Sequence, residues 1–220
     1  MNFFQAIILG IVQALTEYLP VSSSAHIRII GDLMLGADPG AAFTAIIQIG
    51  TELAVILYFR RDIINILSHW FGCLFGKNGP DWRARMGRGD KYATLGWNVI
   101  VGSIPIIILG FTLQNIIETS LRNLWITVTV LFLFGLLLWI VDARSRQIKT
   151  MDDMNYRDAF LFGLGQSMAL IPGVSRSGGT ITVGRALGYT RESAVRLSFL
   201  MAFPAVFGSG LLDAVKAVKN

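Results

Sequence analysis

Two polar segments decide the fold: EYLPVSSSAH at positions 17–26 and PGVSRSGGT at positions 172–180, each set in strongly apolar sequence. Proline removes a backbone N–H and glycine is conformationally free, so a continuous helix is not expected through either segment. A bilayer offers no water to unpaired backbone groups, so a broken helix at membrane depth persists only where protein or a wet cavity satisfies it. Both segments therefore indicate a functional site.

The composition around these segments is that of a membrane protein. Hydrophobic residues make up 53% of the 220 residues and charged residues 15%, and the mean hydropathy is +0.58. These values argue against a soluble domain and predict an all-α polytopic membrane protein, with residues 1–220 as a single integral-membrane domain. Four apolar stretches approach the roughly 20 residues that a spanning helix needs: 41–59, 97–117, 124–141 and 197–215.

Two further apolar segments run directly into the polar ones. Residues 3–19 lead into the first and resume as 27–35, and residues 159–171 lead into the second and resume as 181–187. Each half of the chain is thus predicted to form a helix, a break and a second helix.

The net charge of +5 is distributed unevenly along the chain. The stretch 60–91 carries seven Lys or Arg against three Asp, which predicts a basic cytoplasmic loop at 60–96. Next to membrane spans, this charge favours orientation and contact with anionic lipid headgroups over nucleic-acid binding. The loop at 32–40 is then expected on the outer side, so the two broken segments enter the membrane from opposite sides.

A short sequence similarity between the two halves of the chain agrees with this topology. Gly10-Ile-Val-Gln13 precedes the first break and Gly163-Leu-Gly-Gln166 precedes the second. We therefore expect an inverted-topology repeat, with repeat one at 1–59 and repeat two at 158–215. Its two broken re-entrant helices would meet near the bilayer midplane, as in many transporter folds.

The two breaks carry complementary chemistry. In the second, a Ser, an Arg and a Gly pair precede a helix, so backbone N–H groups and a guanidinium can hold a phosphate. The residues expected to bind phosphate are Ser175, Arg176, Ser177, Gly178 and Thr180. The first break supplies Glu17, three serines and His26, which can bind a metal, deliver a nucleophile and move protons. Together they outline a phosphoryl-transfer site.

Several structural interpretations stand beside this one. The serines at 22–24 can cap the following helix, and Glu17 and Arg176 can form a purely structural ion pair. Gln48 and Glu52 lie four residues apart on one helix face, where a structural role is slightly favoured over lining a cavity. A polyprenyl-phosphate transporter or flippase is the alternative function, because such carriers also use broken helices in inverted repeats.

The two segments resemble the signature motifs of the undecaprenyl-diphosphate phosphatase family, the bacitracin-resistance proteins of bacterial envelopes. The resemblance extends to IQIGT at 47–51, MDDMNYR at 151–157 and LSFL at 197–200, and so covers nearly the whole chain. It implies hydrolysis of undecaprenyl diphosphate to the monophosphate and inorganic phosphate, which recycles the lipid carrier for cell-wall synthesis. It also implies a multi-pass protein of the bacterial cytoplasmic membrane whose active site faces the outer side.

The resemblance also implies roles for individual residues. Glu17, Ser23, His26 and Arg176 become the catalytic set, and Glu17 with Gln13 the acidic motif that holds a divalent cation, Mg²⁺ or Ca²⁺. The partners are a polyprenyl diphosphate and membrane lipids, without nucleic acid. Two mechanisms stay open: attack by Ser23 with His26 as base, or attack by water that His26 activates. Whether the chain acts alone or as a homodimer is also open.

The chain departs from the family pattern in two important places. Position 13 is Gln where many members have Glu, which weakens the expected metal site because one carboxylate is lost. The chain also stops at Asn220 after one span of the second half, whereas the resemblance implies further membrane helices.

Overall fold

The computed structural model describes residues 1–113 and 124–219, and within these residues it is helical and contains no β-strand. The all-α prediction is therefore confirmed for the described part of the chain. The elements are α1 (Phe3–Tyr18), α2 (Ser23–Leu35), α3 (Ala41–Tyr58), α4 (Arg60–Leu74), α5 (Trp82–Arg85), α6 (Lys91–Thr112), α8 (Leu124–Arg144), η1 (Met151–Asp153), α9 (Tyr156–Ser167), η2 (Met168–Leu170), α10 (Arg176–Ala186) and α11 (Arg191–Lys219).

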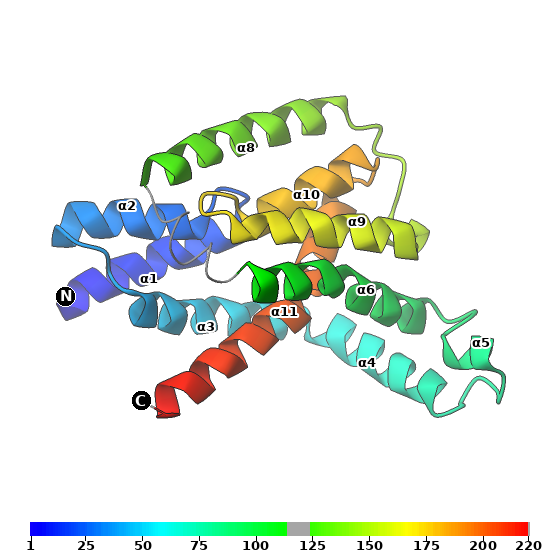
Figure 1. Ribbon diagram of the computed structural model, residues 1–220. Coiled ribbons are helices and arrows are strands. Elements are labelled where there is room, and N and C mark those ends of the chain that lie inside the picture. The colour runs from blue at the N-terminus through cyan, green and yellow to red at the C-terminus, as the bar shows by residue number, and fades with distance from the viewer. Residues whose placement is uncertain (114–123, 220) are drawn as a thin grey trace.

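Two helical hairpins, α1–α2 and α9–α10, approach each other from opposite ends of the molecule, and their tips meet at its centre (Figure 1). The predicted succession of helix, break and helix is confirmed in both halves. The second helix of each hairpin begins earlier than expected, at Ser23 and at Arg176, because the polar residues themselves form its first turn. The tips of the hairpins are thus helix N-termini.

The core lies where α6, α9, α10 and α11 pack together. Its buried side chains include Val99, Phe162, Tyr189 and Leu197. Helices α6 and α9 approach so closely that a Cβ added at Gly163 would lie 2.2 Å from the carbonyl oxygen of Gly102. This close packing fixes α9, the first helix of the second hairpin, against α6.

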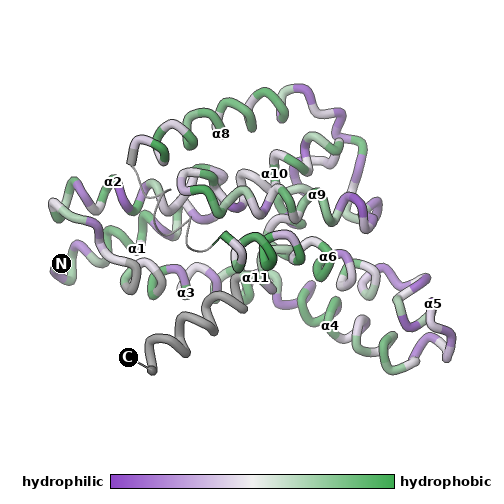
Figure 2. The backbone as a smooth tube through the Cα atoms, viewed as in Figure 1, coloured by the Kyte–Doolittle hydropathy of each residue, from purple (hydrophilic) through white to green (hydrophobic). Residues whose placement is uncertain are grey.

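Two helices among the described residues are long and apolar enough to cross a membrane, α6 and the Trp125–Arg144 part of α8. Apolar residues run along α8, whereas hydrophilic residues gather around α5 and at the adjoining ends of α8 and α9 (Figure 2). In the apolar stretch of α8 only 6% of the residues are buried within the protein. Such exposure suits a helix that faces lipid. The bounds of the predicted span 97–117 differ from those of α6, which begins at Lys91 and ends at Thr112. Positions 114–117 lie outside the described residues.

The segment 60–96, predicted to be a basic cytoplasmic loop, contains α4, α5 and the beginning of α6. Its place on the cytoplasmic side stays a prediction. Helix α4 forms because one of its faces is apolar and packs on α6. The ring centroids of Trp70 and Trp97 lie 5.3 Å apart at this contact. Asp90 caps α6 by accepting the Ala93 N–H and contacts His69 Nδ1 at 2.8 Å. Burial alone would raise the pKa of the Asp90 carboxyl, but these hydrogen bonds hold it below its usual range.

An ion-pair cluster fixes α8 to the far end of the second hairpin. Arg185 is fully buried; it donates to the Asp142 carboxylate at 2.5 Å and to the Tyr189 carbonyl at 2.6 Å. Arg191 also pairs with Asp142, at 2.8 Å. Because the buried guanidinium has both a charged and a neutral acceptor, this cluster satisfies a group that would otherwise be costly to bury.

Candidate active site

Glu17 lies at the centre of the site, in the last turn of α1. Its Oε1 accepts a hydrogen bond from Arg176 Nη2 at 2.7 Å, and its Oε2 accepts from Ser23 Oγ at 2.5 Å and from Gln13 Nε2 at 3.1 Å. The ion pair joins residues that are 159 positions apart in the sequence. The Glu17 side chain is 14% exposed and that of Arg176 22%, so both charges are largely withdrawn from solvent.

The second break provides a preformed helix N-terminus. Ser175 precedes α10 in an extended conformation, and its Oγ accepts the Gly178 N–H at 3.1 Å, an N-cap bond. Ser177 Oγ donates to the Leu19 carbonyl at 3.5 Å, a long contact that reaches across to the first break. Arg176, the first residue of α10, thereby faces Glu17.

The first break is built differently, because Ser22 precedes α2 with φ at 62° and its side chain makes no cap bond. A left-handed backbone is unfavourable for a residue with a Cβ, and such strain concentrates at functional sites. The capping interpretation of the 22–24 serines is therefore wrong: Ser23 donates to Glu17, and the Ser22 and Ser24 hydroxyls contact each other at 3.2 Å.

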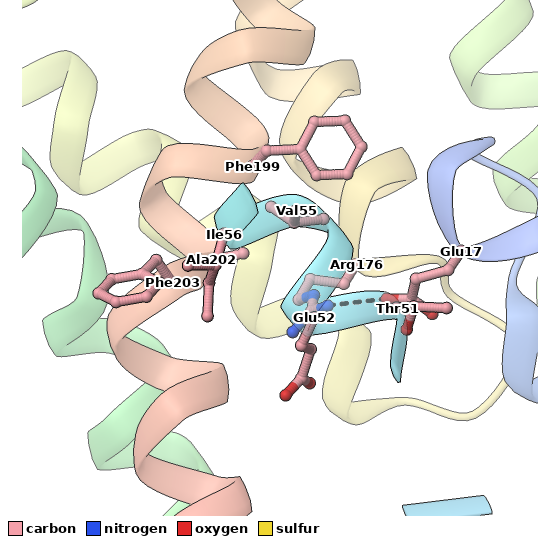
Figure 3. A pocket seen from close by; sticks show the side chains of 9 residues that line it. All are labelled: Glu17, Thr51, Glu52, Val55, Ile56, Arg176, Phe199, Ala202 and Phe203. Atoms are coloured by element: carbon pink, nitrogen blue, oxygen red, sulfur yellow. Dashed lines mark hydrogen bonds and ion pairs between the residues drawn. The ribbon is translucent and has the colours of Figure 1, made fainter. Parts of the chain in front are cut away.

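Two cavities adjoin the Glu17–Arg176 ion pair, and both residues line each cavity. The polar cavity, of about 230 Å³, is otherwise lined by Ser22, Ser23, Ser24, Gln48, Ile106, Ala169, Leu170, Val174, Ser175 and Ser177. The α3–α11 cavity, of about 50 Å³, is otherwise lined by Thr51, Glu52, Val55, Ile56, Phe199, Ala202 and Phe203. Figure 3 shows the ion pair of this second cavity, with Glu52 on α3 beside it and the aromatic side chains on α11.

His26 does not form a hydrogen bond with Ser23. Its Nδ1 lies 2.9 Å from the Ser22 carbonyl oxygen, and because a carbonyl only accepts, Nδ1 carries the proton. The ring lines a third cavity, of about 280 Å³, together with Ser175 and Gly178. Nε2 is therefore the ring nitrogen that can accept a proton there.

The remaining predicted residues divide according to their surroundings. Ser175, Arg176 and Ser177 line the polar cavity, whereas Gly178 lines the cavity of His26. Thr180 is fully buried and donates to the Arg176 carbonyl at 2.7 Å, so its hydroxyl is used within α10. Gln13 is buried and donates its amide to Glu17, which orients the carboxylate.

Sequence reasoning gave too little weight to Gln48 and Glu52. Gln48 Nε2 donates to Glu52 Oε1 at 2.9 Å; Gln48 lines the polar cavity and Glu52 the α3–α11 cavity. Tyr18 contributes as well, since its hydroxyl donates to the Thr51 carbonyl at 3.0 Å and ties α1 to α3. The available indication was two polar residues, four apart, on an otherwise apolar helix.

The donor chemistry of the site fits a cation only in part. Within 1–113 and 124–219 no group of three or more His, Cys, Asp or Glu is placed to hold a metal ion. Two carboxylates, Glu17 and Glu52, do line one cavity. Magnesium is commonly held by one or two carboxylates together with substrate phosphates. The residues therefore fit a divalent cation that is shared with a phosphorylated ligand, and they form no complete protein cage.

The arrangement as a whole suits transfer of a phosphoryl group. The Ser23 hydroxyl and the Arg176 guanidinium both contact the Glu17 carboxylate. Further serine hydroxyls line the polar cavity at the N-terminus of α10. These are the parts needed to bind an anion, to deprotonate a nucleophile and to stabilise developing negative charge.

Comparisons with known proteins agree over the whole chain. The model of the family described as bacitracin resistance protein BacA matches residues 6–220. An undecaprenyl-diphosphatase of Bifidobacterium longum subsp. infantis is 89% identical over 220 residues, which are 100% of this chain and 75% of the relative. That of Bifidobacterium adolescentis is 72% identical over the same shares of both chains. That of Paenarthrobacter aurescens is 54% identical over 224 residues, covering 100% of this chain and 77% of the relative.

Proposed function

This chain belongs to the BacA family of bacitracin resistance proteins, and from that premise we infer that it is an undecaprenyl-diphosphatase. It is a membrane enzyme that hydrolyses undecaprenyl diphosphate to undecaprenyl phosphate and inorganic phosphate. The reaction recycles the lipid carrier of cell-wall synthesis and underlies bacitracin resistance. One observation carries the assignment of this activity to particular residues: the hydrogen-bonded chain from Ser23 through Glu17 to Arg176, which joins the two breaks.

The diphosphate head group binds in the polar cavity. Arg176 offers a planar fork of donors that suits phosphate oxygens, and the Ser175 and Ser177 hydroxyls line the same space. The N-terminus of α10 adds a favourable dipole for a bound anion. Binding requires Arg176 to exchange at least part of its contact with Glu17 for contact with the ligand.

Ser23 is the nucleophile, and Glu17 accepts its proton across the 2.5 Å hydrogen bond. The Ser23 oxygen forms a bond to the terminal phosphorus as the bond from that phosphorus to the bridging oxygen breaks. Undecaprenyl phosphate leaves with the bridging oxygen. Water then attacks the phosphorus of the phosphoserine, with His26 Nε2 accepting its proton. The bond from phosphorus to the Ser23 oxygen breaks, Glu17 returns its proton to that oxygen, and inorganic phosphate is released.

Glu17 would hold a divalent cation together with the bound diphosphate. The chemistry of the cation is to neutralise part of the negative charge on the phosphoryl oxygens. Gln13 keeps the Glu17 carboxylate in position through its 3.1 Å hydrogen bond.

We propose that the chain forms an inverted-topology repeat in the cytoplasmic membrane, with its active site toward the outer side. The two hairpins approach from opposite ends, and hydrophilic residues gather around α5, at one end of the molecule (Figures 1 and 2). In a Cys73→Ser background, Ala37→Cys is expected to react with an impermeant thiol reagent in intact cells, and Arg85→Cys only after lysis. The reverse pattern would overturn this orientation.

The decisive experiment measures phosphate release from undecaprenyl diphosphate by the purified chain in detergent. A transporter or flippase needs two compartments, whereas a phosphatase does not, so release in detergent supports the enzyme. Catalytic turnover should yield one inorganic phosphate for each lipid monophosphate. If the lipid diphosphate stays intact with Mg²⁺ or Ca²⁺ present, the proposed activity is wrong.

A further inference from the structure

Glu52 is a charged side chain inside the site that the proposed chemistry does not yet use. It projects from α3, is half-buried, and shares the α3–α11 cavity with Glu17 and Arg176 (Figure 3). Electrostatically it is attracted by Arg176 and repelled by Glu17. A carboxylate in such apolar surroundings is costly unless a partner compensates its charge.

The two carboxylates of the cavity differ in how many of their oxygens are already engaged. Both oxygens of Glu17 accept hydrogen bonds, from Arg176, Ser23 and Gln13. Glu52 accepts a side-chain hydrogen bond at Oε1, from Gln48, and its Oε2 has no hydrogen-bond partner among the described residues. Glu52 therefore has more capacity to take a further ligand than Glu17 has.

The charges of the cavity point to the kind of ligand. Two carboxylates and one guanidinium leave one net negative charge among its lining residues. A diphosphate in the polar cavity, on the other side of the same Glu17–Arg176 pair, adds several more negative charges close by. Its binding is unfavourable unless a cation accompanies it. Oxygen ligands of this type suit Mg²⁺, Ca²⁺ or Mn²⁺.

We propose that Glu52 is the second carboxylate for the divalent cation that binds with the diphosphate, and that it supplies the charge that Gln13 lacks. The inference rests on the proposed function. Gln13 has the separate task of orienting Glu17, since its amide group donates to that carboxylate. Gln48 holds Glu52 toward the cavity in the same way, from the preceding turn of α3.

The test measures cation binding directly, with Mn²⁺ as the probe. The purified chain in detergent is titrated with Mn²⁺ in the presence of a methylene-bridged farnesyl diphosphonate, which the proposed activity cannot hydrolyse. Free Mn²⁺ is followed by electron paramagnetic resonance, and a titration of the diphosphonate without protein is subtracted. Glu52→Gln keeps the shape and the Gln48 contact but removes the charge. We expect the Mn²⁺ Kd to rise by about tenfold or more, on the scale of other perturbed metal sites. The Mg²⁺ concentration for half-maximal phosphate release should rise in parallel.

Two further variants keep the result interpretable. Glu52→Asp, which retains the charge on a shorter side chain, should recover part of the Mn²⁺ affinity and covers the case in which Glu52→Gln does not fold. Glu192→Gln, at an exposed position in the first turn of α11, controls for loss of a carboxylate and should leave both readouts unchanged.

The outcomes separate this inference from the proposed function. An unchanged Mn²⁺ Kd in Glu52→Gln overturns the inference even if its melting temperature falls, because Glu52 would then be structural. If the wild-type chain releases no phosphate, the proposed function fails independently. If the wild-type chain needs the cation for phosphate release and Glu52→Gln leaves that requirement unchanged, the inference is overturned. The enzyme assignment then stays intact.

Discussion

The two breaks differ in the residue that precedes the following helix. Ser22, before α2, has a left-handed backbone and its side chain forms no cap, whereas Ser175, before α10, is extended and its hydroxyl caps the helix. The helices that follow differ too: most of α10 is buried, but in α2 only Ala25, Ile27 and Gly31 are. In the first break the Ser22 and Ser24 hydroxyls contact each other and Ser23 donates to Glu17, whereas in the second break the Ser175 hydroxyl is used in the cap. This comparison fits the proposed mechanism, in which Ser23 of the first break is the nucleophile and the capped N-terminus of α10 binds the diphosphate.

The largest effect should come from disturbing the packing of the second hairpin. In Gly179→Ala the added Cβ would lie 2.4 Å from the Gly165 carbonyl oxygen, and backbone cannot yield as a flexible side chain can. We expect a destabilisation of at least about 1 to 3 kcal/mol, seen as loss of the monodisperse folded protein and of phosphate release. Gly10→Ala, in the first hairpin, meets nothing within 4 Å and should behave as wild type. Equal melting temperatures for the two variants would contradict the packing difference.

Removing the Ser23 hydroxyl, the nucleophile of the proposed mechanism, should abolish most activity without affecting the fold. Ser23→Ala is expected to lower kcat by about 100-fold or more, the lower end of what positioned proton transfer contributes, with a nearly unchanged melting temperature. The matched control is Ser24→Ala, next along the chain, whose hydroxyl contacts Ser22 and not Glu17. Comparable losses in both variants would remove Ser23 from the mechanism.

Arg176→Lys tests whether the ion pair between the breaks serves the ligand or the fold. Lysine keeps the charge but not the planar fork, and a charge-assisted hydrogen bond is worth about 1.5 to 3 kcal/mol. Phosphate release should fall roughly 10-fold to 100-fold while the melting temperature holds. Near wild-type turnover in Arg176→Lys, together with unfolding of Arg176→Ala, would show that the pair is structural.

The smallest effect compares the serines that precede the two helices. Ser175→Ala removes an N-cap bond and should cost about 1 kcal/mol of stability, whereas Ser22→Ala removes no cap and should cost less. Thermal unfolding of the two variants in the same detergent measures the difference. A larger loss in Ser22→Ala would reverse the comparison between the breaks.

The sequence predicted the broken helices because proline, glycine and serine act locally on the backbone. It also anticipated a contact between Glu17 and Arg176, since two charges in apolar sequence need partners. It did not predict the helical α4, because a strongly basic stretch hides an apolar face that becomes apparent only against Trp97 of α6.

The finer geometry of the site depended on tertiary contacts. The left-handed backbone of Ser22 aims Ser23 at Glu17, and no residue pattern specifies that conformation. Gln13 and Gln166 occupy similar positions in the two halves but have different surroundings. Gln13 donates to Glu17, whereas the side-chain amide of the fully buried Gln166 has no hydrogen-bond partner among the described residues. Similar positions in the two halves thus carry different roles.

The ion pair between the hairpins also bears on which lipids can occupy the site. Because Glu17 and Arg176 line both cavities, any head group that reaches Arg176 must first compete with Glu17 for it, and its apparent affinity is reduced accordingly. A diphosphate has enough negative charge to compensate for the disrupted pair, whereas a phospholipid diester has a single charge. If the head group binds at Arg176 as proposed, the Glu17–Arg176 pair favours the substrate over ordinary phospholipids, which vastly outnumber it in the membrane.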